Sequence, residues 1–311
     1  MRVSRASALA FLLLGALVYG ALYYGAERLL YAKGRSNPFF KIETLAEPRA
    51  DWLILGASHA MPLDFGDTNA WLERESRARI VNLAAPGAGP LYNRFVLEHF
   101  LERHRALGLL YVVDSFAFYS RTWNEERFAD AKLLRRTPFE PALARRLAGY
   151  VLHEGVDPRA LLDYVSGFSK INNRERFQLD VWEGELQFAR EYRPSSTAVA
   201  KRVAYLYPDQ TPPAQRGRYL AELGRILERA QAAGMKVEVI KLPAPAQFRQ
   251  ALPQEPEFDQ ALARLLEARG VRLADFSGAV PEPRFYFDSD HLNRAGIERL
   301  AAAGFGALLA R

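Results

Sequence analysis

The segment 51–60, with the sequence DWLILGASHA, constrains the fold of this chain most strongly. Residues 52–55 form an apolar run of the length of a buried strand, and Gly56 ends it so that Ser58 follows closely. A serine just past the carboxyl end of a central strand lies at the sheet edge where open α/β folds bind ligands. Ser58 is therefore a candidate nucleophile, although a serine in this place can also act as the N-cap of a helix.

Apolar strands and amphipathic helices alternate along the rest of the chain. Further strands are predicted at 80–83, 109–113, 237–242 and 271–276, and helices at 92–107, 215–233, 256–269 and 295–309. This alternation predicts an α/β fold with right-handed crossovers. We expect a three-layer, flavodoxin-like sandwich around a five-stranded parallel sheet.

The alternation is interrupted at residues 116–206. This segment is rich in arginine and aromatic residues, and its predicted helices, such as 141–152, are short and amphipathic. We interpret it as a helical insertion, which would be either a lid that grips substrate or a solvated cover. The expected domains are a cytoplasmic stub and transmembrane anchor (1–26), a tether (27–50) and an α/β domain (51–311) that contains the insertion.

Residues 6–26 carry no charge, and as a helix they would be about 31 Å long, close to the roughly 30 Å hydrocarbon core of a bilayer. Arg2 and Arg5 precede this stretch, and Tyr19, Tyr23 and Tyr24 gather near its far end. The pattern predicts a single transmembrane helix with a cytoplasmic amino terminus. A cleaved signal peptide is the competing interpretation, but the apolar stretch is longer than usual for one, so we favour a retained anchor.

Composition limits the remaining function classes. The chain has 311 residues and is 49% hydrophobic, which is ample for a packed core. It has no cysteine, so neither a disulfide framework nor a cysteine-based metal site is expected. The net charge of +6 is spread without a block of basic residues, so we predict no nucleic-acid partner and read the charge as compatible with a membrane surface.

A second chemical signal lies between the last predicted strand and helix, at residues 285–296. Asp288 and His291 are three residues apart, so one turn places both side chains on one side, where a carboxylate orients an imidazole base. Asp290 is the rival carboxylate, but adjacent side chains tend to point apart. The fold brings this loop to the same sheet edge as Ser58, which would supply a nucleophile, an orienting acid and a base.

Three short blocks together carry a family resemblance: GASH at 56–59, NLAAPGAG at 82–89 and DSDHLNRAG at 288–296. They resemble the nucleophile, glycine and D-x-x-H blocks of the SGNH/GDSL hydrolase superfamily. With an anchor and a helical insertion, the chain is similar to the cell-envelope branch that includes alginate O-acetylation proteins and the D-alanyl-transfer protein of teichoic acids. The resemblance covers about residues 51–113 and 237–309.

The resemblance implies catalytic roles for Ser58 as nucleophile, His291 as base and Asp288 as its orienter. It places oxyanion donors or substrate contacts at Gly87, Asn82, Ser115 and His59, with the amides of Ser58 and Gly87 as oxyanion donors. The chain departs from the family where a third donor, an Asn, is usual. That place reads VVDSFAFYS, with Asp114 and Ser115, and Asn124 is a candidate replacement from the insertion; Ala57 also stands where an Asp usually precedes the serine.

The resemblance therefore implies a serine acyl-transfer enzyme, either an O-acyltransferase or an esterase. Its substrate would be an acylated glycan or another envelope polymer, and a membrane-bound O-acyltransferase would be its partner. The expected place is the bacterial inner membrane, as a single-pass protein with its catalytic domain periplasmic or extracellular. No cofactor or metal is expected. The alternative is a non-catalytic SGNH-like binding or assembly protein in which the site survives as a pocket.

Overall fold

The computed structural model describes residues 4–208 and 213–310, which divide into two compact units. We call Thr44–Arg127 with Val181–Arg311 the sheet unit, and Met1–Glu43 with Phe128–Asp180 the helical unit. Residues 116–206, predicted as one insertion, contribute to both units. Their two ends belong to the sheet unit and their middle part belongs to the helical unit.

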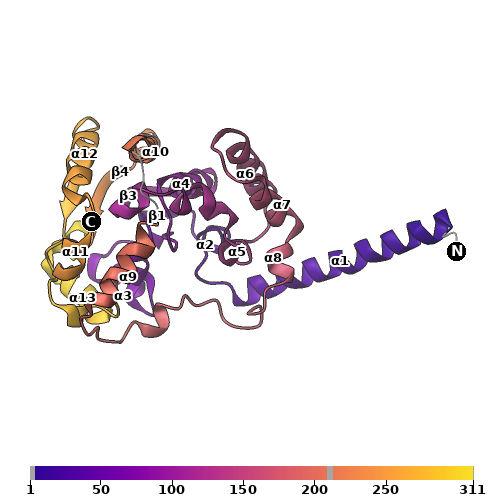
Figure 1. Cartoon of the computed structure of the whole chain (residues 1–311), viewed down its shortest axis with the longest axis horizontal. Helices are drawn as coiled ribbons and strands as arrows, with labels where there is room; N and C mark the ends of the chain where they lie inside the picture. Colours follow the sequence, from indigo (N-terminus) through magenta and orange to yellow (C-terminus); the bar gives the residue numbers. More distant parts are fainter. Residues whose placement is uncertain (1–3, 209–212, 311) are drawn as a thin grey trace. The chain divides into compact units, whose positions relative to one another are not determined.

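Within the described residues, five parallel strands form one sheet in the order β2-β1-β3-β4-β5, of which β1, β3 and β4 are labelled in Figure 1. The strands are β1 (Arg49–Leu55), β2 (Ile80–Asn82), β3 (Arg105–Val112), β4 (Lys236–Lys241) and β5 (Arg272–Asp275). The α/β class and the flavodoxin-like parallel sheet predicted from the sequence are confirmed. From β1 the chain continues to β2 on one side of the sheet, and from β3 it continues to β4 on the other side. In such folds, ligands bind at the carboxyl ends of the two strands between which this reversal occurs, here β1 and β3.

The helices of the sheet unit lie on both faces of the sheet. They are α3 (Thr68–Ser76), α4 (Pro90–Arg103), α9 (Ser196–Leu206), α10 (Pro213–Ala232), α11 (Ala246–Ala251), α12 (Glu255–Glu267), α13 (Arg294–Leu300) and α14 (Gly306–Leu309). On one face, Trp52 and Ile54 share a buried cluster with Leu72 of α3, Ile297 of α13 and Leu309 of α14. Neighbouring strand residues point to the opposite face, where α4 and α10 pack together. These layers position the ends of the strands and therefore the loops that follow them.

Two predicted helices differ from the observed ones. The helix predicted at 92–107 ends at Arg103 in the structure, and β3 already begins at Arg105. The helix predicted at 295–309 is interrupted around Gly304, where φ is +116°. Apolar spacing alone does not separate the end of a helix from the start of a strand when the connection between them is one residue long.

The helical unit contains α1 (Arg5–Lys33), α2 (Pro38–Thr44), α5 (Ala131–Leu134), α6 (Pro141–His153), α7 (Pro158–Ser166) and α8 (Phe168–Ile171). Among the described residues, α1 is the helix that is long and apolar enough to cross a membrane, by length and composition. Figure 1 shows α8 beside the carboxyl-terminal part of α1, while the first turns of α1 project away from the other helices of this unit. Residues 27–50, expected as a tether, include the last turns of α1 and the buried Phe39 and Ile42 of α2.

Candidate active site

Ser58 lies directly after β1, at the first residue of a 3-10 helix (Ser58–Asp64). Gly56 makes this exit feasible, because a Cβ atom there would lie 2.8 Å from the Cβ atom of Val112 on the neighbouring strand β3. The serine is nearly enclosed, with 5% of its surface exposed. The close approach of β1 and β3 therefore holds Ser58 at the switch point of the sheet.

A chain of hydrogen bonds connects Ser58, His291 and Asp288. The Oγ atom of Ser58 lies 2.9 Å from Nε2 of His291, and Nδ1 of His291 lies 2.8 Å from Oδ2 of Asp288. Asp288 also accepts the backbone N–H of His291 at 2.8 Å, which ties the carboxylate to the loop that carries the imidazole. Burial raises the pKa of Asp288, but the neighbouring imidazole outweighs it, so the pKa lies below its usual range. Asp288 is thus an anionic partner for His291.

Aromatic rings fix the plane of the His291 imidazole. Phe287 stacks on it, with ring centroids 5.4 Å apart and an interplanar angle of 7°. Trp182 meets it edge-on at 5.6 Å. With 2% of its side chain exposed, His291 has little freedom to turn away from Ser58. The ring contacts therefore preserve the hydrogen-bond chain.

His59, next to Ser58, is bound to a carboxylate at each ring nitrogen. Its Nδ1 atom lies 2.5 Å from Oδ1 of Asp114, and its Nε2 atom lies 3.0 Å from Oδ2 of Asp290. Burial lowers the pKa of His59, but Asp114 and Asp290 outweigh it and raise the pKa from 6.5 to about 10. His59 is therefore an imidazolium at neutral pH, and both of its N–H groups are already donated.

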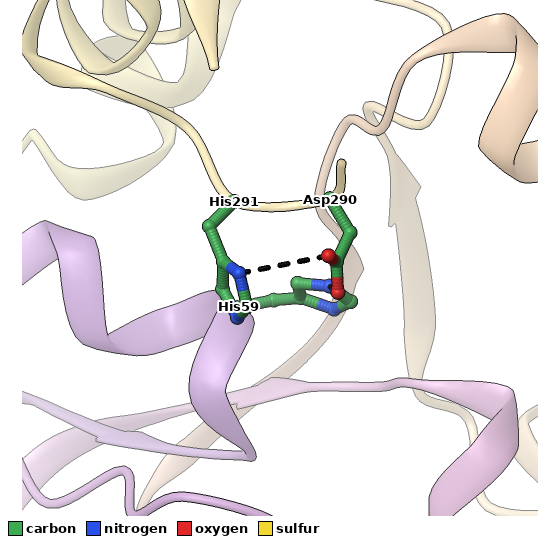
Figure 2. A group of neighbouring side chains, drawn as sticks. All are labelled: His59, Asp290 and His291. Carbon is green, nitrogen blue, oxygen red and sulfur yellow. Dashed lines mark hydrogen bonds and ion pairs between the residues drawn. The ribbon is translucent and has the colours of Figure 1, made fainter. Parts of the chain in front are cut away.

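Asp290 lies beside His59 and His291, as Figure 2 shows. It accepts hydrogen bonds from Nε of Arg202 and from Oγ of Ser289, both at 2.8 Å, and its Oδ1 atom is 3.7 Å from Nδ1 of His291. Burial raises the pKa of Asp290, but its cationic neighbours hold it far below its usual range. Asp290 therefore serves the ion pairs, whereas Asp288 makes the hydrogen bond to His291.

The group drawn in Figure 2, His59, Asp290 and His291, is close enough together to hold a metal ion. Its chemistry does not fit one, because an ion-binding histidine must offer a neutral nitrogen. Both nitrogens of His59 face carboxylates, and Arg202 already neutralises Asp290. We interpret the group as an ion-pair network.

Asn82 is the last residue of β2, and Gly87 lies in the loop that follows it. Gly87 has φ of +61°, and a Cβ atom there would lie 2.5 Å from the ring of Trp123, so a glycine is required on both counts. The amide of Asn82 donates to the carbonyl of Ala60 at 2.8 Å and its oxygen accepts the N–H of Ala84 at 3.0 Å. Asn82 thus braces the turn that carries Ser58.

In the described part of the chain, the backbone amides of Ser58 and Gly87 donate no hydrogen bond to the protein. These are the two amides predicted as oxyanion donors, and their role stays a prediction. Asn124, the candidate third donor, is different. Its amide group donates to the carbonyls of Ala117 and Ser120 at 2.8 and 2.9 Å, so both of its hydrogens are used within the fold. The side chain of Ser115 pairs with the hydroxyl of Tyr207 at 2.8 Å.

The sequence did not reveal three side chains that shape the site: Arg202, Trp182 and Phe287. Phe287 adjoins the D-x-x-H block, so an aromatic residue beside that block was a usable signal. Arg202 and Trp182 come from the last part of the predicted insertion, far from the site in the chain, and no local pattern marks them. The sequence marked Asp114 only because it stands in the block where the family usually has an Asn as third oxyanion donor; it did not indicate the contact with His59.

No protein-family model matches this chain, and no curated protein matches it. Solved structures with similarity include a GDSL-like lipase from Bacteroides thetaiotaomicron, with 8% identity and a TM-score of 0.40 over 84% of this chain and 87% of that one. TesA matches with 13% identity and a TM-score of 0.39 over 83% and 97%. An acylhydrolase candidate from Bacteroides fragilis matches with 9% identity and a TM-score of 0.41 over 85% and 87%. At this level of similarity, function has to be inferred from the site's own geometry.

Proposed function

We propose that this protein is a serine acyl-transfer enzyme, an O-acyltransferase or esterase of the SGNH type. The observation that carries the proposal is the hydrogen-bond chain from Ser58 Oγ to His291 Nε2 at 2.9 Å and from His291 Nδ1 to Asp288 at 2.8 Å. A serine hydroxyl is a poor nucleophile unless a base removes its proton. Here the base is held by an anionic carboxylate on the side opposite the serine.

The reaction proceeds in two halves. Ser58 Oγ attacks the acyl carbon of an ester and passes its proton to His291 Nε2, while the amides of Ser58 and Gly87 stabilise the oxyanion. The ester C–O bond then breaks, and the imidazolium returns the proton to the leaving oxygen. In the second half, the hydroxyl of a sugar or a water molecule attacks the acyl carbon and gives its proton to His291. The bond between Ser58 Oγ and the acyl group then breaks, the imidazolium returns the proton to Ser58 Oγ, and the new ester or the free acid leaves.

A membrane anchor and an envelope polymer as substrate complete the proposal. α1 supports the anchor, because large apolar side chains along it are exposed, including Phe11 at 76% and Leu17 at 71%. The three motif blocks, through their resemblance to the envelope branch, support an acylated glycan or related polymer as substrate and a membrane-bound acyltransferase as partner. On this proposal the sheet unit lies on the periplasmic or extracellular side of the bacterial inner membrane.

Covalent labelling of the full chain in detergent tests the enzyme proposal. A fluorophosphonate should label the wild type on one serine, and Ser58→Ala should abolish the label while leaving the circular dichroism spectrum unchanged. His291→Ala should reduce the labelling rate nearly as far, because the base is lost. Labelling without turnover of simple esters would indicate a transferase whose acceptor is missing from the assay.

A non-catalytic envelope binding protein is the competing function. It is favoured by a departure from the family pattern: Asn124 does not replace the family's third oxyanion donor, because both hydrogens of its amide group are donated within the fold. A folded wild type that no fluorophosphonate labels, or that is labelled equally after Ser58→Ala, would support this alternative over the enzyme.

A further inference from the structure

The helical unit carries an exposed apolar stripe along α7 and the start of α8. Leu162 and Val165 are three residues apart on one side of α7, and Phe168 begins α8 after Gly167, whose φ of +68° ends α7; 68%, 50% and 61% of the surfaces of Leu162, Val165 and Phe168 are exposed. Ala160 and Tyr164 of the same helix are buried on its other side. The unit is therefore packed on one face of α7, and the opposite face presents apolar side chains.

This stripe is attached to α1 at a defined height. The hydroxyl of Tyr19 donates to the carbonyl of Ser166 at 2.9 Å, and Lys170 forms an ion pair with Glu27. Lys170 is almost fully buried, with 2% of its side chain exposed, so the pair is a fixed contact. Residues 166–170 thus run along α1 from the level of Tyr19 to the level of Glu27, the first charge after the apolar stretch.

The length of α1 decides where the membrane ends. From Ala6 to Tyr19 a helix rises only about 20 Å, which is too short for a hydrocarbon core of roughly 30 Å. Lipid must therefore continue past Tyr19, by about 10 Å, toward Glu27. The segment beside that stretch of α1 is 166–170, which contains the exposed Phe168.

Val165 extends the contact toward the middle of the span. Together with Phe139 and Ser166 it lines an apolar groove against α1, which contributes residues from Phe11, Leu12 and Ala16 to Tyr19 and Tyr23. Leu12 and Ala16 lie in the middle part of the uncharged stretch 6–26, which is the part that crosses the hydrocarbon core. A side chain beside them is at the depth of acyl chains.

From these observations we infer that the α7–α8 stripe is embedded in the membrane leaflet at the carboxyl-terminal end of α1, with lipid acyl chains as its partner. The inference rests on the membrane anchor proposed above. The helical unit is then held in the lipid by the span and by Leu162, Val165 and Phe168, so it is both anchored and oriented at the surface.

Site-specific fluorescence in lipid nanodiscs tests the inference with the full chain. The chain has no cysteine, so each introduced one carries the sole label. An environment-sensitive fluorophore is attached at Val165→Cys, at Phe168→Cys as a second probe, and at Leu12→Cys in the anchor. Leu179→Cys is the matched control, since Leu179 is 55% exposed in the same unit. The backbone N–H of the neighbouring Asp180 donates to the carbonyl of Lys33 at 2.9 Å, so Leu179 lies near the end of α1, well beyond Glu27.

The quencher is a lipid with a doxyl group halfway along its acyl chain. The inference predicts that Val165, Phe168 and Leu12 lose most of their fluorescence while Leu179 keeps it. Quenching at Leu12 but not at Val165 and Phe168 would overturn the inference and leave the anchor intact. An unquenched Leu12 would overturn the anchor and the inference together.

Discussion

Asp288 and Asp290 both approach Nδ1 of His291, at 2.8 and 3.7 Å, yet their other partners give them different roles. Asp288 is 39% exposed and bonds to the loop of His291, whereas Asp290 is buried among Arg202 and His59. One carboxylate holds the His291 ring, and the other neutralises a pair of cations. Substitution by the isosteric amide separates these roles.

Asp288→Asn should slow fluorophosphonate labelling by about 10⁴-fold, because the amide favours the wrong imidazole tautomer. Its free energy of unfolding should change by no more than about 1 kcal/mol, since the side chain is partly exposed. Asp290→Asn should instead lower the free energy of unfolding by about 3–5 kcal/mol, because it leaves the buried cations without a counter-charge. Stopped-flow labelling and urea unfolding of both variants check this. The reverse pattern would make Asp290 the orienting acid.

His59 should make stability depend on pH. Its folded pKa of about 10 exceeds the ordinary value of 6.5, so its contribution is complete below about pH 6.5 and is lost as pH rises toward 10. His59→Gln should therefore be less stable than the wild type by about 3–5 kcal/mol at pH 6 and by much less at pH 10. Urea unfolding at a series of pH values measures the difference, and a difference that stays constant over this range would contradict the ion-pair network.

At the scale of elements, the loop after β2 is shaped by the close approach of the Gly87 backbone to the ring of Trp123. Gly87 and Gly66 have similar left-handed φ values, +61° and +57°, but a Cβ atom at Gly66 would meet nothing within 4 Å. Gly66→Ala is therefore a matched control for the cost of the backbone conformation, about 1–2 kcal/mol. Gly87→Ala adds a collision with Trp123.

We expect Gly87→Ala to reduce the labelling rate by about 10²-fold, because the collision displaces an oxyanion donor. Gly66→Ala should lower stability and leave the rate of the folded protein unchanged. Labelling rates measured well below each variant's unfolding temperature provide the test. Equal rates for the two variants would remove Gly87 from the oxyanion site.

The strands that frame the site were predictable because each is a short apolar run that ends at a turn residue. In the loop 285–296, the pairing of Asp288 with His291 was predictable, since their three-residue spacing puts both side chains on one turn. The network around His59 was not predictable. Arg202 reaches Asp290 from α9, and no periodic pattern reports a contact between residues 88 positions apart in the chain.

At the scale of the whole molecule, the described residues divide into units that separate chemistry from the proposed anchor. Ser58, Asp288 and His291, with Trp182 and Arg202 around them, belong to the sheet unit, and α1 belongs to the helical unit. The sequence predicted the apolar stretch and the change of rhythm at 116–206. It did not show that this segment is shared between the units, because its short amphipathic helices look alike in both parts.

The central claim is that the sheet unit forms an acyl-enzyme on Ser58. The most direct measurement is peptide mass spectrometry of the full chain in detergent after brief exposure to an activated acetyl ester. We predict a single acetyl group on the peptide that contains Ser58, absent from Ser58→Ala and strongly reduced in His291→Ala. A wild-type protein that remains unmodified, or one acetylated equally in Ser58→Ala, would contradict the account.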